Sequence, residues 1–260
     1  MDNYLRHAMK IRLMFFITVL TTTFYGQVYK SKNLVDFVPK GYIIQKYQGG
    51  VFAEGWNEIK GDLNKDGLDD IILIIKGTDK KNLIKDENRG ILDRNRRGII
   101  VLLNKKDHYE LGIRNYNCFS SENEDGGVYS APELSVEIKG GNLHINYLHG
   151  RYGQWSYTFR FQNSDFELIG YDESNNRGPV TESRTSINFS TKKKNLEVNT
   201  NPDADDGDEV FKTTYKKIHI EKLIKLSEIK NFDDLDMSVY WIITVHYRLE
   251  QLLSFILGNN

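Results

Sequence analysis

The sequence predicts a mainly β protein, made of antiparallel meander or partial-propeller-like sheets with a short α-helical segment at the C-terminus. The 260 residues include fifteen Tyr and thirteen Phe but only four Pro, a composition that favours sheet. Two all-apolar runs, 71–75 and 99–103, have the length of buried strands. After residue 109, apolar and polar residues alternate, which is typical of strands with one buried face.

The alternating region predicts a series of hairpins. Residues 134–138 and 143–147 flank Lys139-Gly140-Gly141-Asn142, a strong hairpin signal. Further strands are expected at 155–161, 166–171, 186–190, 196–199 and 210–220. Consecutive strands of this kind indicate an antiparallel meander with one buried and one wet face.

The two apolar runs flank a charged stretch, residues 79–97, which contains few apolar side chains. Such a stretch is typical of an exposed loop. Because both runs are apolar throughout, we expect them to be neighbouring strands of a sheet that is covered on both faces.

Three parts are expected along the chain: a signal peptide at 1–26, a β-rich domain at 27–220 and a C-terminal helix and strand segment at 221–260. Lys10 and Arg12 precede an apolar core at 13–20, as in exported proteins. A buried strand or a membrane anchor is the alternative, but the uncharged stretch 13–26 is shorter than the ~20 residues of a spanning helix. We therefore expect a periplasmic or extracellular protein with no stable membrane insertion after signal cleavage.

The formal net charge is −1, with 35 basic and 36 acidic residues, so no overall field favours nucleic acid as a partner. Cys118 is the only cysteine, which excludes an internal disulfide. An exported chain of this kind needs another stabilising element, and a bound cation would supply one. A catalytic thiol is the less favoured interpretation of Cys118, because a single cysteine is more often a small buried residue.

The segment Gly61-Asp62-Leu63-Asn64-Lys65-Asp66-Gly67-Leu68-Asp69-Asp70 has the pattern of a cation-binding loop. Side-chain oxygens recur at positions 62, 64 and 66, a glycine follows, and a carboxylate closes the series at 70. Ca²⁺ takes about six to eight oxygen ligands, which a loop of this spacing supplies. A solvated Asx turn is the structural alternative.

This loop resembles the calcium loops of FG-GAP/VCBS-type, integrin-like repeats, with the pattern D-x-[DN]-x-D-G-x-x-D. The resemblance implies Ca²⁺ as cofactor. It implies side-chain ligands from Asp62, Asn64 and Asp66, the carbonyl of Leu68, and Asp70 directly or through water. Gly67 would take the sharp bend. An EF-hand is disfavoured because its twelfth position needs a Glu, whereas Leu73 stands there within an apolar run.

Three further polar clusters compete as sites. Residues 201–209 form an acidic stretch, either a second cation site or, as we favour, a solvated loop. Residues 120–127 contribute Glu122 and Glu124. The stretch 147–155 combines His149, Arg151, Tyr152 and Trp155 with glycines, side chains that suit carbohydrate, peptide or anionic ligands.

Structural alternatives exist for these clusters. Tyr152 and Trp155 would then cover the core, and the arginines at 94, 96 and 97 would form ion pairs with Glu122 and Glu124. Arg151 would be a buried partner of one of those glutamates.

The favoured function is an exported, calcium-stabilised binding or structural module of the bacterial envelope, with an unknown ligand such as carbohydrate or peptide. The alternative is a secreted hydrolase or lyase that acts on carbohydrate or peptide, with Glu122, Glu124, His149 and Arg151 around one cleft. The sequence carries no G-x-S-x-G, H-E-x-x-H, P-loop or G-x-G-x-x-G motif. No catalytic residue is therefore assigned.

Overall fold

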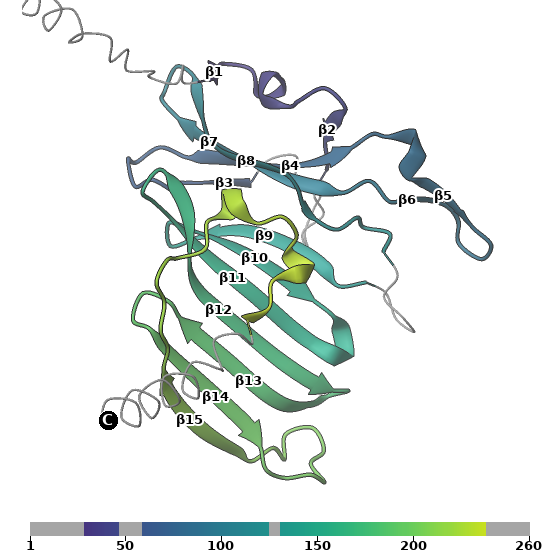
Figure 1. Cartoon of the computed structure of the whole chain (residues 1–260), viewed down its shortest axis with the longest axis vertical. Helices are drawn as coiled ribbons and strands as arrows, with labels where there is room; N and C mark the ends of the chain where they lie inside the picture. The colour runs from purple at the N-terminus through teal and green to yellow at the C-terminus, as the bar shows by residue number, and fades with distance from the viewer. Residues whose placement is uncertain (1–28, 47–58, 125–130, 238–260) are drawn as a thin grey trace, which may run out of the picture.

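A computed structural model describes residues 29–46, 59–124 and 131–237. This part of the chain is mainly β, as predicted, and all strand pairs are antiparallel (Figure 1). The strands form a six-stranded sheet, a seven-stranded sheet and a separate two-stranded hairpin. No described helix is long and apolar enough to cross a membrane.

The six-stranded sheet has the order β1-β8-β7-β4-β2, and β3 also pairs with β4. Its strands are β1 (Lys30–Ser31), β2 (Tyr42–Ile44), β3 (Ile59–Gly61), β4 (Asp70–Gly77), β7 (Arg97–Asn104) and β8 (Tyr109–Phe119). The apolar strands β4 and β7 are neighbours, as predicted. A 3₁₀ turn, η1 (Leu34–Phe37), places Phe37 against one face of this sheet.

The seven-stranded sheet is an uninterrupted meander from β9 to β15. Its strands are β9 (Glu133–Lys139), β10 (Asn142–Leu148), β11 (Gly153–Gln162), β12 (Asp165–Arg177), β13 (Val180–Asn188), β14 (Lys193–Asn199) and β15 (Phe211–Lys217). The predicted β9–β10 turn has φ of 59° at Gly140 and 71° at Gly141, the left-handed values that a two-residue hairpin requires. The hairpin prediction for this pair is confirmed.

Most of the charged stretch 79–97 is exposed, as predicted, but Leu92, Asn95 and Arg97 within it are buried, and it contains secondary structure. After the turn η2 (Lys80–Asn82), β5 (Leu83–Asp86) and β6 (Gly90–Asp93) form the isolated two-stranded hairpin. This hairpin projects away from both sheets (Figure 1).

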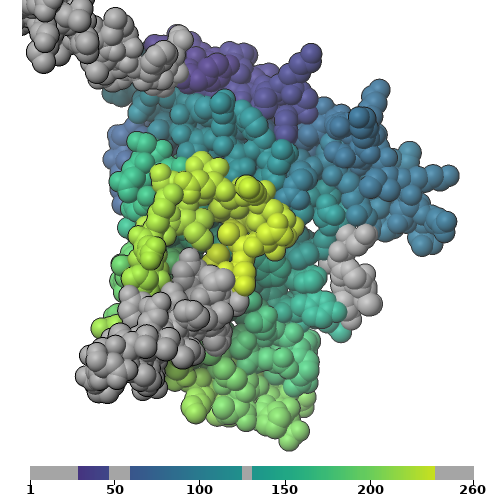
Figure 2. Space-filling model, viewed as in Figure 1, coloured from purple at the N-terminus to yellow at the C-terminus, as the bar shows by residue number. Residues whose placement is uncertain are grey.

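The described part of the C-terminal segment contains two single 3₁₀ turns, η4 (Leu226–Glu228) and η5 (Phe232–Asp234). Leu226 and Phe232 are buried in the core that the two sheets share. The segment therefore lies across the molecule as a strap, seen in yellow in Figure 2. The remaining part of the predicted helical segment, from residue 238 on, lies outside the described residues.

Most buried side chains belong to one core between the two sheets, to which β4, β7, β10, β11 and β12 all contribute. A second, smaller cluster covers the opposite face of β4 and β7. The six-stranded sheet is thus buried on both faces at its centre, whereas the seven-stranded sheet buries one face only.

Candidate functional site: a cation-type loop and a polar trough

The loop between β3 and β4 folds around its own side chains. Asp62 Oδ1 and Asn64 Oδ1 both accept from the amide of Asp66, at 3.1 and 2.9 Å, so these two oxygens lie close together. Asp62 Oδ2 accepts from the amide of Gly67, whose φ of 86° makes the expected left-handed bend. Asp66 Oδ1 accepts from the amide of Leu68 at 3.0 Å.

Asp70 differs from the other acidic residues of the loop because it is fully buried. Its Oδ2 accepts from the amides of Leu63 and Asn64, at 2.9 and 3.3 Å, and its Oδ1 accepts from the amide of Asn104 at 2.9 Å. Burial raises the pKa of the Asp70 carboxyl, although these three donors act in the opposite direction. Asp70 therefore joins the loop to the end of β7.

The loop lies at the junction of the two large sheets. Leu63 is buried in the shared core, at 1% exposure. A Cβ at Gly141 in the β9–β10 turn would lie 3.4 Å from the backbone oxygen of Asp62. Anything that orders this loop also orders the contact between the sheets.

A hollow of about 1110 Å³ lies on the polar face of the seven-stranded sheet, and we call it the polar trough. It is lined by side chains from six consecutive strands, β9 to β14, and by the β10–β11 loop. A single hollow that touches six neighbouring strands requires that the sheet curve around it. The polar face of the meander is therefore its concave face.

The floor of the trough carries a row of short polar side chains that are direct cross-strand partners. The row runs from β9 to β14 through Ser135, Asn146, Ser156, Asp172, Ser186 and Asn195. Neighbouring strands lie about 4.8 Å apart, so the row offers a hydrogen-bonding group at each such step.

A β-bulge decides which residue of β12 faces the trough. Phe161 pairs with Phe166 and Phe159 with Leu168, but Thr158 pairs with Gly170 because the register shifts there. Without the shift, Asp172 would lie on the buried face, since one residue of register reverses every side chain.

Residues 149–155 form one rim of the trough, and His149, Arg151, Tyr152 and Trp155 all line it. The turn η3 (Gly150–Tyr152) leaves Arg151 exposed and Tyr152 exposed at 45%. The rings of His149 and Tyr152 lie 4.9 Å apart. Trp155 is stacked on Tyr147, with ring centroids 5.3 Å apart, and packs against the shared core.

Glu122 and Glu124 do not line the trough with these residues. Glu122 accepts from Gln45 Nε2 at 2.6 Å and pairs with Lys76 at 3.2 Å. Glu124 accepts from the hydroxyl of Ser121 at 2.7 Å and lies 3.5 Å from the guanidinium of Arg94. The expected pairing of these glutamates with the charged stretch is thus found for Glu124, and neither is paired with the exposed Arg151 in the described structure.

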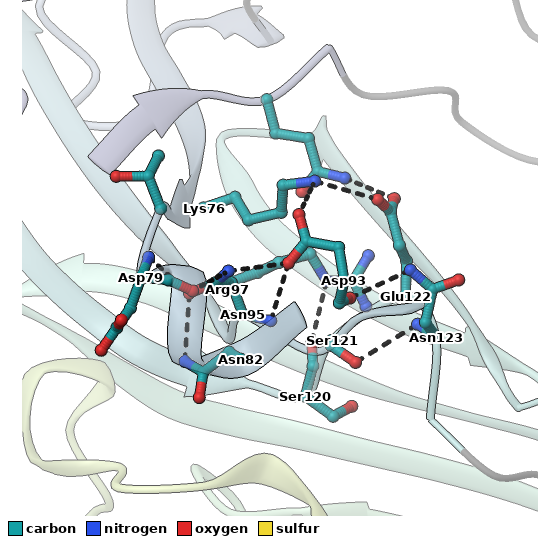
Figure 3. A network of polar contacts seen from close by, with 12 residues as sticks. Lys76, Asp79, Asn82, Asp93, Asn95, Arg97, Ser120, Ser121, Glu122 and Asn123 are labelled. Atoms are coloured by element: carbon teal, nitrogen blue, oxygen red, sulfur yellow. Dashed lines mark hydrogen bonds and ion pairs between the residues drawn. The ribbon is translucent and has the colours of Figure 1, made fainter. Parts of the chain in front are cut away.

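Glu122 belongs instead to a polar network at the base of the β5–β6 hairpin (Figure 3). Lys76 joins Glu122 to Asp93, at 3.0 Å from the latter. Asn95 is buried; its side chain donates to Asp93 Oδ1 at 2.8 Å and accepts from the amide of Asp79 at 2.9 Å. These bonds attach the hairpin to the sheet and give the network a structural role.

The other sequence candidates have no site around them. Cys118 is fully buried, and burial raises the pKa of its thiol, so it is an inert core residue. In the acidic loop 201–209, Asp203, Asp205, Asp206 and Asp208 are exposed, as expected of a solvated loop. Within the described residues, no three His, Cys, Asp or Glu side chains cluster as ligands of a metal.

Comparison with known proteins adds no relative: no family model, no curated protein and no solved structure matches this chain.

Proposed function

We propose that this chain is an exported binding module of the bacterial envelope that holds a polar ligand, a carbohydrate or a peptide, in the polar trough. One observation carries the proposal: a single large hollow on the unburied face of the meander, with hydrogen-bonding side chains from six strands on its floor. Ligand sites are concave and contain a small number of placed polar groups that fix the orientation of the ligand. Exposed residues on the floor, such as Asp172 and Ser186, leave it accessible.

The hydrolase or lyase alternative gains no support from the placement of its residues. It requires Glu122 and Glu124 to share a cleft with His149 and Arg151, but only the latter two line the trough. Both glutamates are instead engaged with Lys76, Gln45, Ser121 or Arg94.

A blocking substitution tests the binding proposal. Ser186→Trp places a large side chain on the trough floor at an exposed position, where it causes little strain. The full-length wild type should capture ligands from glycan and peptide arrays, and Ser186→Trp should lose that capture. Glu182→Trp is the matched control, because Glu182 is exposed on the same strand but does not line the trough. Equal capture by all three proteins would refute the trough as the site.

We also propose that Ca²⁺ binds the β3–β4 loop through Asp62, Asn64, Asp66, Leu68 and Asp70. These residues offer the oxygen ligands that Ca²⁺ prefers. The side-chain oxygens of Asp62 and Asn64 already lie close together, because both accept from the amide of Asp66. Its role would be stabilisation of the junction between the sheets.

Thermal unfolding in calcium and in chelator tests this second part. A cation that binds only the folded state adds roughly 2.7 kcal/mol at a hundredfold excess over Kd. Asp66→Ala should remove most of this gain, because Asp66 is exposed and its other contacts are hydrogen bonds within the loop and a 4.0 Å ion pair with Lys105. Identical melting temperatures of the wild type in both buffers would exclude the calcium site.

Export remains a prediction from residues 1–26, which lie outside the described residues. Mass spectrometry of the protein from the producing cell should find a mature N-terminus near Gln27. A membrane-bound form that begins at Met1 or Met9 would contradict it.

A further inference from the structure

We propose that the polar trough selects a linear oligosaccharide that carries amino groups, such as an oligomer of glucosamine. This inference rests on the proposed function of the trough and adds the chemical class of its ligand. It follows from the charge of the lining, the position of Asp172 and the repeat of the floor.

The lining is acidic although the chain as a whole is nearly neutral. Five carboxylates line the trough against two guanidinium groups, those of Arg151 and Arg184. Arg184 is already engaged, since it lies 3.6 Å from Glu197 and its guanidinium sits 4.4 Å from the ring centroid of Phe211. The remaining field favours a cationic ligand over an anionic one such as a uronate or a nucleic acid.

Asp172 is the carboxylate best placed to meet that ligand. It stands within the polar row, between Ser156 and Ser186, and the bulge in β12 directs it to this face. It is exposed, and it forms no ion pair with any residue in the described ranges. A charged side chain without a partner in a concave surface is available to a ligand ammonium group.

The spacing of the polar row on the trough floor suits a sugar chain better than a peptide. The row crosses the strands with a step of about 4.8 Å, which is close to the length of one pyranose unit in a β-linked chain. Peptides on sheets are usually held by backbone pairing at an edge strand, whereas the trough offers side chains of strands that are already paired. Tyr152, exposed on the rim, offers an aromatic face to a sugar ring.

The experiment is calorimetric titration of the full-length protein at mildly acidic pH, where sugar amines carry charge. The probes are glucosamine hexamer, its N-acetylated form, a galacturonate hexamer and hexalysine. We expect the glucosamine hexamer to bind most tightly, and added salt to weaken it. Asp172→Asn should lower the affinity for the glucosamine hexamer by up to about fivefold, which corresponds to one partly exposed ion pair. The affinity for the N-acetylated hexamer should not change. Glu182→Gln is the control outside the trough and should change nothing.

The outcomes separate this inference from the proposed function. If the N-acetylated hexamer binds as tightly and Asp172→Asn has no effect, the preference for amines is wrong while the trough stands. If hexalysine binds more tightly than every sugar, the ligand is a basic peptide and the sugar class is wrong. If Ser186→Trp leaves the binding of the glucosamine hexamer intact, the trough itself is not the site, and both proposals fall.

Discussion

The two large sheets differ in what covers their faces. In β4, Ile72 and Ile74 enter the core between the sheets, while Ile71 and Leu73 enter the smaller cluster on the opposite face. The seven-stranded sheet buries residues such as Phe159 on one side only and leaves Asp172 exposed on the other. A sheet covered on both faces can only contribute stability, whereas a sheet covered on one face can contribute both stability and a surface that binds.

The largest difference between the sheets should appear at two glycines. A Cβ at Gly98 in β7 would lie 2.3 Å from the backbone carbonyl of Tyr116, and backbone has no room to move inside a covered sheet. At Gly170 in β12 the nearest atom is Thr158 Cβ at 3.3 Å, a side-chain contact that can relax. Gly98→Ala should therefore cost about 3 kcal/mol or more in unfolding free energy, and Gly170→Ala below about 1.5 kcal/mol. Chemical denaturation measures both, and equal losses would contradict the contrast.

The second prediction concerns the junction loop. Asp70→Ala leaves the amides of Leu63, Asn64 and Asn104 without their acceptor. The expected loss is about 2–4 kcal/mol, because unpaired polar groups near the core are costly. The loss should already be present in chelator, since these hydrogen bonds do not depend on the cation, and it should be larger in calcium, where a proposed ligand is lost as well. Asp69→Ala, at the exposed neighbour, is the matched control and should cost below about 0.5 kcal/mol. A loss confined to calcium-containing buffer would mean that Asp70 acts only as a ligand.

The strands with a clear apolar pattern could be predicted from the sequence, and the extended ends of β12 and β13 could not. Up to Tyr171, β12 alternates or is apolar, but from Asp172 to Arg177 it is polar on both faces. These residues are strand because they pair with β11 and β13, a long-range condition that composition does not contain.

The same reasoning explains why the rim of the trough was found and its floor was missed. His149 to Trp155 is a continuous stretch of unusual composition, so the sequence draws attention to it. Ser135, Asn146 and Asp172 are ordinary residues far apart in the chain that meet only through strand register. The strand register can be counted from the β9–β10 turn. The sequence does not indicate the bulge opposite Thr158, however, and a register counted without the bulge places Asp172 on the buried face.

The last prediction compares two arginines, of which Arg151 should show a very small effect on stability. Arg97 of the covered sheet is buried and donates from Nε to the carbonyl oxygen of Ser120 at 2.8 Å. Arg151 on the trough rim is exposed. Arg97→Ala should cost about 2–4 kcal/mol because it removes a buried, charge-assisted hydrogen bond and its packing.

Arg151→Ala should instead change the unfolding free energy by below about 0.5 kcal/mol, as is usual for exposed positions. The sequence predicted that Arg151 either contacts a ligand or is a buried partner of a glutamate, and its exposure removes the second option. Because the fold is then unaffected, any change in ligand capture by Arg151→Ala reports on the rim alone. Thermal unfolding measures the effect on stability, and array binding of the same preparation measures the effect on ligand capture. If Arg151→Ala lowers the melting temperature as much as Arg97→Ala does, the rim is needed for stability. The division between a stabilising sheet and a binding sheet would then be wrong.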